Sequence, residues 1–421
     1  MIGWTEILQN IIYFVSLYYV VFWLIVLLEY EEPRSKRLQK HPPVTIIIPA
    51  YNEEENIIPT IDSVAALQYP PELIKVIVVD DGSKDRTYAR AKEHLKSIRK
   101  KHPKITFQLL TQKNAGKHAA MNNALRYTHT PFFATLDADS FPYRDALKNI
   151  MAEFDDPKIA AVSPILKVYK PKNAIQTIQW LEYAVNHFYK SLISNVDAIH
   201  VLPGPLSVYR TAVVKKLGGF RDAHKTEDME IAMRIQKADY KIRQCNNAFV
   251  TTKAPYTIKS LYRQRHRWNH GTFKNLIDYR KMMFSRKYGD FGLFQLPVIL
   301  ISGIMGISIL GLILYDFFKS IKPTFKLIQL YNYNIISYLQ HTEFNMIWLD
   351  LDLKSLVTFL GFFIITLIVL WLSLRLYREK YRTKITFSFI LYIFFYYIFL
   401  AIVWIGVFKD VLLRKETGWK K

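Results

Sequence analysis

Cysteine is almost absent from this chain of 421 residues, which contains only Cys245. A single cysteine excludes an intrachain disulfide and a metal site built on several thiolates. The phosphate-binding pattern G-x-x-x-x-G-K-[ST] is also missing, which removes support for a kinase or a nucleoside triphosphatase. We find no internal repeat and no low-complexity linker, so the middle of the chain is expected to fold as an ordinary globular region.

Charged residues are absent from four long stretches near the two ends of the chain. A helix needs roughly 18–20 apolar residues to cross a bilayer core, and these runs approach or exceed that length: Ile11–Leu28, Leu293–Tyr315, Ser355–Leu374 and Ile385–Phe408. Buried helices of a soluble core are the alternative, but four such runs are unusual in one soluble domain. No basic residue precedes the first run and no small-residue cleavage site follows it, so we expect a retained anchor.

Basic residues indicate how the chain is oriented in the membrane. Lys and Arg are absent before the first run, whereas Arg34, Lys36, Arg37 and Lys40 follow it. Because Lys and Arg favour the cytoplasmic side, we expect the amino terminus outside and a cytosolic domain at the plasma membrane. Both flanks of the last run are basic, so either the tail lies outside or part of 317–353 makes an additional pass.

The formal net charge of +22 raises the question of a nucleic-acid partner. Membrane proteins carry Lys and Arg for topological reasons, and anionic lipid and a nucleotide diphosphate also attract them. The sequence has no basic segment interleaved with aromatics in the manner of a nucleic-acid site. We therefore expect membrane lipids as partners and no nucleic acid.

The region between the first two apolar runs alternates short β-rich stretches with helical patterns. This alternation indicates an α/β fold with a mostly parallel sheet. We expect strands at Val44–Pro49, Lys75–Asp80, Ile105–Leu110 and Phe132–Leu136, and helices at Glu53–Leu67, Asp85–Arg99 and Lys117–Tyr127. Tyr256–Tyr288 mixes basic with apolar residues, which favours a helix at the membrane interface. We divide the chain into an anchor (1–30), an α/β domain (31–255), an interfacial segment (256–290) and a C-terminal region of about three spans (291–421).

Acidic residues follow two of the predicted strands, where ligands bind in open α/β sheets. In an extended chain Asp137 and Asp139 face the same side and could share a divalent cation, although an exposed turn explains such a pair equally simply. Asp80 and Asp81 precede a glycine, which suits either a turn or a nucleotide contact. Lys117 follows Asn-Ala-Gly at the start of a predicted helix, a suitable place for an anion.

Two further clusters carry both a structural and a functional interpretation. Thr226-Glu227-Asp228 could cap a helix, with Thr226 as the N-cap, or Asp228 could be a general base. Gln264-Arg265-His266-Arg267-Trp268 could grip phosphate oxygens and offer an aromatic face to a sugar, or it could be an interfacial basic helix.

Seven segments, in this order, resemble the family 2 glycosyltransferases, in particular the membrane-integrated group of cellulose, chitin, hyaluronan and poly-N-acetylglucosamine synthases. The resemblance covers roughly residues 40–290, and seven motifs in one order are very specific. The segments are IIIPAYNEEE (46–55), VVDDGSKDRT (78–87), NAGKHAAMNNAL (114–125), LDADS (136–140), PGPLSVYR (203–210), TEDMEIAMRI (226–235) and QRHRW (264–268).

The resemblance implies a GT-A (Rossmann-like) fold and inverting transfer from a UDP-sugar, dependent on Mg²⁺ or Mn²⁺. Asp228 would be the catalytic base with Glu227 beside it, and Asp137 and Asp139 would lie at the diphosphate and the metal. The remaining residues implied in binding the donor or acceptor are Pro49, Tyr51, Glu53, Asp80, Asp81, Lys117, Gly204, Gln264, Arg265, Arg267 and Trp268.

The same resemblance leaves the product open. We expect a processive synthase that extends a β-linked polysaccharide, with transfer of one sugar to a lipid or lipid-linked glycan as the alternative. A nucleotide-sugar-binding subunit without activity is a more distant one. Two features depart from the family, because we find neither a PilZ-like domain nor an F-x-V-T-x-K gating loop in this sequence. Gly418-Trp419-Lys420-Lys421 faintly resembles the W-G-T-R gating element of hyaluronan synthases.

Overall fold

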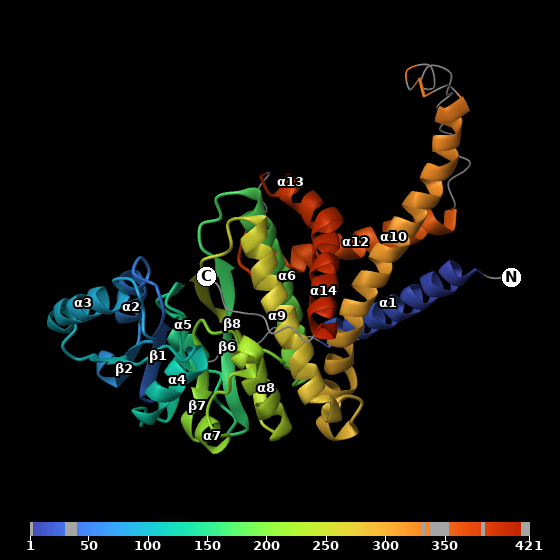
Figure 1. The fold of residues 1–421 in the computed structure, drawn as a ribbon. Coiled ribbons are helices and arrows are strands. Elements are labelled where there is room, and N and C mark those ends of the chain that lie inside the picture. Colours follow the sequence, from blue (N-terminus) through green and yellow to red (C-terminus); the bar gives the residue numbers. More distant parts are fainter. Residues whose placement is uncertain are drawn as a thin grey trace.

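The computed structural model describes residues 3–29, 40–330, 333–334, 336, 353–379 and 384–413. An α/β domain lies at one end of the molecule and long apolar helices lie at the other (Figure 1). Arg34, Lys36 and Arg37, on which the predicted orientation partly depends, lie outside the described residues, as does the motif at Gly418–Lys421.

One eight-stranded sheet forms the centre of the domain, in the order β3-β2-β1-β4-β7-β6-β8-β5. The pairs β1–β2, β1–β4, β2–β3 and β6–β8 are parallel, and the other three pairs are antiparallel. The strands are β1 Val44–Ala50, β2 Ile74–Asp80, β3 Thr106–Thr111, β4 Phe132–Thr135, β5 Ser140–Pro142, β6 Ile159–Val168, β7 Ser207–Arg210 and β8 Lys241–Thr252. The four strands predicted from sequence are confirmed, whereas the mixed half of the sheet was not predicted.

The sheet is buried on both faces, which explains why its strands are apolar at successive positions. In β1, Ile46 and Ile48 enter the core on one face and Ile47 enters the core on the other. Helices α2 Ile57–Ala65 and α3 Thr87–Lys101 pack on the first face, and α4 Lys117–Arg126 and α8 Glu227–Lys237 pack on the second. Shorter helical elements are η1 Pro71–Leu73, α5 Ala146–Met151, α7 Thr211–Lys216 and η2 Ala223–Lys225.

Two long helices, α6 Ala174–Asn195 and α9 Ile258–Asp278, connect the sheet to the apolar helices. Helix α6 contacts β6 and β8 and also α12 and α13, and α9 contacts α14. Helix α9 begins with a reciprocal cap in which the Thr257 hydroxyl accepts from Ser260 N at 3.2 Å. The predicted interfacial segment is therefore, over most of its length, a helix packed between the domain and α14; η3 Arg280–Met282 and η4 Arg286–Tyr288 follow it.

Each of the four predicted apolar runs lies in a helical part of the chain. The elements are α1 Trp4–Leu28, the π-helical turn η5 Phe291–Gln295, α10 Leu296–Leu330, α12 Leu353–Leu376, α13 Lys384–Leu391, the π-helical turn η7 Tyr392–Tyr396 and α14 Tyr397–Leu412. Among the described residues, three helices are long and apolar enough to cross a membrane, namely Trp4–Leu28, Phe291–Leu330 and Ser388–Leu412, and Leu360–Leu376 is a shorter apolar helix.

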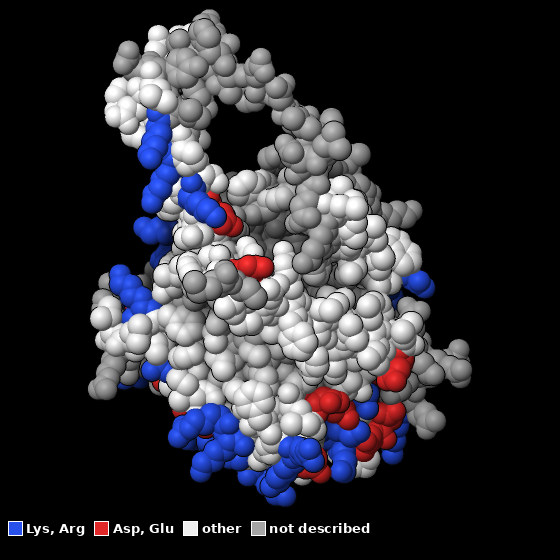
Figure 2. All heavy atoms as spheres, turned by 90° about the vertical axis from the view of Figure 1, so that its right-hand side faces the viewer, with Lys and Arg blue, Asp and Glu red and all other residues white. Residues whose placement is uncertain are grey.

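The apolar helices leave large hydrophobic side chains uncovered. In α1 only Val26 is buried, whereas Phe14 is 73% and Leu28 is 86% exposed. On the side shown in Figure 2, charged side chains gather along the lower edge and on the projecting part at the top, and the broad area between is nearly free of charge. Contact of such an apolar surface with lipid chains is favourable, whereas its contact with water is not, so the chain is a membrane protein.

The single cysteine lies inside the domain. Cys245 is in β8 and is 1% exposed, and burial followed by the nearby Glu153 carboxylate raises the pKa of its thiol to about 12. It therefore packs as a small apolar side chain.

Candidate active site

The loops after β1 and β2 are joined to each other where the strands end. The hydroxyl of Ser83 accepts from Asn52 N at 3.0 Å, and Asn52 Oδ1 accepts from Lys84 N at 2.9 Å. Glu53 N donates to the Thr87 hydroxyl at 2.7 Å. These bonds explain why α2 begins at Ile57 and not at the predicted Glu53. Pro49 lies in β1 opposite Val79, one position before the last β1–β2 pair, and Tyr51 is the first residue after the strand.

Asp80 and Asp81 have different surroundings although both are almost fully buried. The carboxylate of Asp81 accepts from Ala115 N at 3.0 Å, from Gly116 N at 2.9 Å and from Gln112 Nε2 at 2.8 Å. Asp81 therefore holds the Gly116 loop in place. Asp80 has only long contacts on one oxygen, and its Oδ1 lacks a hydrogen-bond partner among the described residues. An unpaired buried acceptor suits a ligand that donates hydrogen bonds.

Lys117 forms an ionic bridge between two parts of the site. It is the first residue of α4, after Gly116 with φ of +93°. Its Nζ lies 2.6 Å from Asp137 Oδ1 and 3.3 Å from Glu227 Oε1. Burial alone would lower the pKa of Lys117, but the carboxylates of Asp137 and Glu227 outweigh it and raise that pKa well above its usual range.

Asp137 and Asp139 lie in the turn between β4 and β5. They follow β4 as predicted, but the expected extended geometry over Asp137–Asp139 was wrong, because the chain turns at Ala138 and Asp139 to start β5. They are nevertheless electrostatic neighbours. Burial, then the negative charges of Asp137 and Glu53, raise the pKa of Asp139 to about 6, and Ser140 Oγ donates to it at 3.2 Å.

Glu227 and Asp228 form the first turn of α8. Thr226 precedes the helix, but its side chain does not cap it as predicted; its hydroxyl donates to Ala223 O at 2.9 Å and accepts from Asn275 Nδ2 at 2.8 Å. Thr226 thus ties the start of α8 to α9. Asp228 is half-buried, and burial followed by the charge of Glu227 raises its pKa to about 6.

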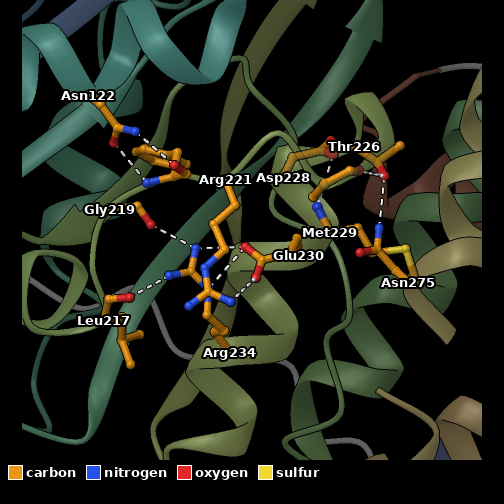
Figure 3. A network of polar contacts seen from close by, with 12 residues as sticks. Asn122, Leu217, Gly219, Arg221, Thr226, Asp228, Met229, Glu230, Arg234 and Asn275 are labelled. Carbon is orange, nitrogen blue, oxygen red and sulfur yellow. Dashed lines mark hydrogen bonds and ion pairs between the residues drawn. The ribbon is translucent and has the colours of Figure 1, made fainter. Parts of the chain in front are cut away.

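A buried network fixes the rest of α8 (Figure 3). Arg234 donates to Glu230 one turn earlier at 2.6 Å and to Gly219 O at 2.7 Å. Asn122 on α4 bonds both the N–H and the C=O of Phe220 in the same loop, at 2.8 and 2.7 Å. Our sequence analysis missed the pair of Glu230 and Arg234, although Glu and Arg at positions i and i+4 of a predicted helix indicate such an ion pair.

The QRHRW segment points its two arginines in different directions. Positions i and i+2 of a helix do not face one another, so Arg265 and Arg267 could not grip the same phosphate. Arg265 is 2% exposed, and it forms a two-pronged ion pair with Glu182 on α6, with its Nε 3.1 Å from Oε1. Its Nε also lies 3.2 Å from the Tyr396 hydroxyl, and its guanidinium lies 4.3 Å from the centre of the Trp268 ring.

The other members of the segment lie nearer to α8. Arg267 donates to Lys225 O at 3.0 Å, just before the Thr226-Glu227-Asp228 turn, and its charge counteracts the rise of the Asp228 pKa. Gln264 accepts from Arg265. The structure thus brings Arg267 toward Asp228 and places Arg265 in the contact between the domain and the apolar helices.

Gly204 lies against the Lys117–Asp137 pair. A Cβ at Gly204 would lie 2.6 Å from Asp137 Oδ2 and 2.6 Å from Lys117 Nζ, and Thr135 Oγ1 donates to its carbonyl at 3.0 Å. Only glycine allows the backbone to approach the pair this closely.

Lys190 on α6 is a further residue that sequence reasoning missed. It is 6% exposed, and its Nζ has no hydrogen-bond partner in the described part of the chain. Burial lowers its pKa to about 7, and the charge of Asp228 opposes that shift. A lysine in the middle of a helix carries no local signal, so only the fold reveals it.

The oxygen atoms available as ligands near Asp137 fit a hard divalent cation. Its oxygens belong to carboxylates, and the crowding that raises the Asp139 pKa is the kind that a bound cation relieves. Within the described residues, no group of three or more His, Cys, Asp or Glu is arranged to hold a metal. Mg²⁺ usually binds proteins through one or two carboxylates together with substrate phosphates.

Relatives of the chain are found among curated proteins. Poly-β-1,6-N-acetyl-D-glucosamine synthase of Staphylococcus epidermidis is 26% identical over 280 residues, which are 64% of this chain and 66% of that protein. The synthase of the same name from Staphylococcus aureus is 26% identical over 298 residues, 66% of this chain and 69% of that protein. The probable glycosyltransferase YdaM of Bacillus subtilis is 27% identical over 265 residues, 60% of each chain. The chain thus matches slightly less than two thirds of the length of the first of these relatives.

A solved structure shares the architecture over nearly the whole chain. The mannosyltransferase PcManGT from Pyrobaculum calidifontis, in complex with GDP-Man and Mn²⁺, superposes with a TM-score of 0.64 at 17% identity. The likeness covers 98% of this chain and 99% of that one, so the shared fold includes the apolar helices.

Two family models match the chain. The model for glycosyl transferase family 2 covers residues 45–218, and the model for glycosyl transferase family group 2 covers residues 132–405, more than half of the 421 residues. With the GT-A architecture of its sheet and its membrane-type helices, the chain belongs to the family 2 glycosyltransferases.

Proposed function

We propose that this glycosyltransferase moves a sugar from a UDP-sugar onto a growing β-linked polysaccharide, with inversion, at the cytosolic face of the plasma membrane. The lysine bridge carries the proposal: Lys117 Nζ lies 2.6 Å from Asp137 and 3.3 Å from Glu227. It joins the strand exit suited to a donor diphosphate to the helix start that holds Asp228. The poly-N-acetylglucosamine synthases among the relatives support a UDP-sugar donor and a polysaccharide product.

Asp228 is the proposed base. Its carboxylate takes the proton of an acceptor hydroxyl, whose oxygen attacks the anomeric carbon opposite the nucleoside diphosphate. The bond from that carbon to the diphosphate breaks, so one displacement inverts the configuration. A pKa of about 6 suits a base near neutral pH. Lys117 and Arg267 supply positive charge around the reaction, and a divalent cation held by Asp137 and Asp139 would neutralise charge on the diphosphate.

The nucleotide is proposed to bind between the loops that follow β1, β2 and β4. Asp80 Oδ1, unpaired in the described chain, would accept a hydrogen bond from the base or ribose. Pro49, Tyr51 and Glu53 border the same place, and Asp81 supports it through the Gly116 loop. Trp268 and Gly204 are proposed to border the acceptor side, with Arg267 next to them.

Donor and product are tested by nucleotide release from the purified, full-length protein in detergent with Mn²⁺ or Mg²⁺. The donors are UDP-glucose, UDP-N-acetylglucosamine, UDP-glucuronate and, because PcManGT was solved with it, GDP-mannose. Products are sized on a gel, and the anomeric configuration is read by NMR. A long β-linked product from one UDP-sugar supports the proposal, and a product of retained configuration would refute inversion.

The base is tested with Asp228→Asn. We expect transfer to fall by about 10²–10⁴ while nucleotide binding is kept. Asp222→Asn is the matched control, because that side chain lies six residues earlier and is 73% exposed. Near wild-type transfer by Asp228→Asn would show that another group takes the proton.

Lys190 favours a second candidate, the transfer of one sugar to a lipid phosphate or a lipid-linked glycan. Its ammonium, which lacks a hydrogen-bond partner among the described residues, is an electrostatic neighbour of Asp228, and its helix packs against α1 through Phe188 and Leu192. An acceptor with a phosphate near its hydroxyl would supply the missing counter-charge. Under this alternative Lys190→Met raises the KM for a polyprenyl-phosphate acceptor, and the product is a single addition.

A further inference from the structure

The carboxylates proposed to meet the metal already have a cation beside them. Lys117 Nζ contacts Asp137 Oδ1 at 2.6 Å, a short ion pair, and the second contact to Glu227 at 3.3 Å holds the ammonium between the turn after β4 and the start of α8. The side chains of Lys117 and Asp137 are 35% and 29% exposed, so a ligand arriving from solvent can reach the pair.

The space around this pair is restricted on one side. The backbone at Gly204 is so close that a Cβ would lie 2.6 Å from both Asp137 Oδ2 and Lys117 Nζ. The hydrogen bond from Thr135 to the Gly204 carbonyl keeps that backbone in position. The Gly204 backbone therefore blocks movement of the Lys117 ammonium on that side while the ammonium contacts Asp137. A divalent cation that binds Asp137 must displace the ammonium or bind close to a like charge.

A donor diphosphate changes this balance. Its oxygens can take over the ammonium of Lys117 and also contribute ligands to a divalent cation, which small divalent cations such as Mg²⁺ usually require in proteins. Without the diphosphate, the lysine and the divalent cation compete for the same carboxylate, and like charges at short range repel.

We propose that Lys117 is an internal counter-ion that occupies the cation position at Asp137 in the empty enzyme and moves to the diphosphate when the donor binds. Metal and donor therefore bind as a pair, each raising the affinity for the other by the same factor. Lys117 thus weakens metal binding in the absence of the donor and contacts the diphosphate when the donor is bound. The inference rests on the proposed donor site, but it concerns how the metal and the donor affect each other's binding there.

The test is Mn²⁺ binding to the full-length protein in detergent, followed by electron paramagnetic resonance without any donor. We expect weak binding by the wild type and binding at least about 10-fold tighter by Lys117→Met, which has nearly the same length and no charge. Lys117→Arg keeps the charge and is expected to remain weak. Lys113→Met, an exposed lysine in the same loop, is the control and should leave Mn²⁺ binding unchanged.

UDP added to the same samples completes the test. It should tighten Mn²⁺ binding in the wild type far more than in Lys117→Met. Equal Mn²⁺ affinities of the wild type and Lys117→Met, or weaker binding by the variant, would overturn the inference. Lys117→Gln replaces the Met variant if the latter unfolds. Because this test measures metal binding and the test of the proposed function measures sugar transfer, either proposal can be refuted while the other stands.

Discussion

The buried pair of Arg265 and Glu182 gives a prediction with a calculable size. Their side chains are 3% and 9% exposed, and the pair joins α9 to α6 with Tyr396 of η7 as a third partner. Arg265→Met leaves the Glu182 carboxylate buried without its partner, which typically costs about 3–5 kcal/mol. At about 2–4 °C per kcal/mol for a domain of this size, the apparent Tm should fall by roughly 6–20 °C.

Differential scanning fluorimetry in detergent at one fixed scan rate measures this change, since membrane proteins often unfold irreversibly. Arg265→Met with Glu182→Met removes both charges and should recover most of the lost Tm. Arg263→Met, an exposed arginine on the same helix, is the control. The sequence motif predicts instead that Arg265 grips the diphosphate. A Tm lowered by less than about 2 °C, with a large loss of donor affinity, would refute our reasoning and favour that alternative.

Three further outcomes are expected. Because burial raises the pKa of Asp228 to about 6, and the proposed base must be ionised to accept a proton, kcat/KM should fall as the pH drops through 6; a profile level down to about pH 4 would contradict this. Asp80→Asn should weaken UDP binding in calorimetry by about 10–100-fold with little change in Tm, whereas Asp81→Asn should mainly lower Tm, because Asp81 accepts hydrogen bonds from the loop before α4. Gly204→Ala places a Cβ 2.6 Å from a carboxylate oxygen and from an ammonium, so transfer should fall by about 100-fold at nearly unchanged Tm; activity near that of the wild type would show that the loop yields.

The first half of the sheet was predictable because it is buried on both faces. The run Ile46–Ile48 in β1 is apolar at successive positions whatever its neighbours are, so the pattern is visible in the sequence alone. The second half depends on pairings between distant residues, for example Ser140 with Thr252, and on antiparallel strands that no local pattern orders. Its topology therefore came only from the structure.

The candidate site divides in a similar way. Motif order brought Lys117, Asp137 and Asp228 to attention, and the fold places them around one ion-pair bridge. Sequence could not tell which way each side chain turns. Arg265 was expected at the donor and lies against Glu182, because a helix sends positions two apart to nearly opposite faces.

The buried cysteine makes the chain convenient for topology mapping. Since Cys245 is 1% exposed, thiol reagents will not reach it in the folded protein. Because the pKa of its thiol is raised to about 12, the thiol also stays in its unreactive protonated form. Any cysteine introduced on the surface is then the one reactive position on an otherwise native background. Lys92→Cys on α3 and Lys319→Cys toward the far end of α10 would report, with an impermeant maleimide on intact cells, on which side of the membrane each end of the molecule stands.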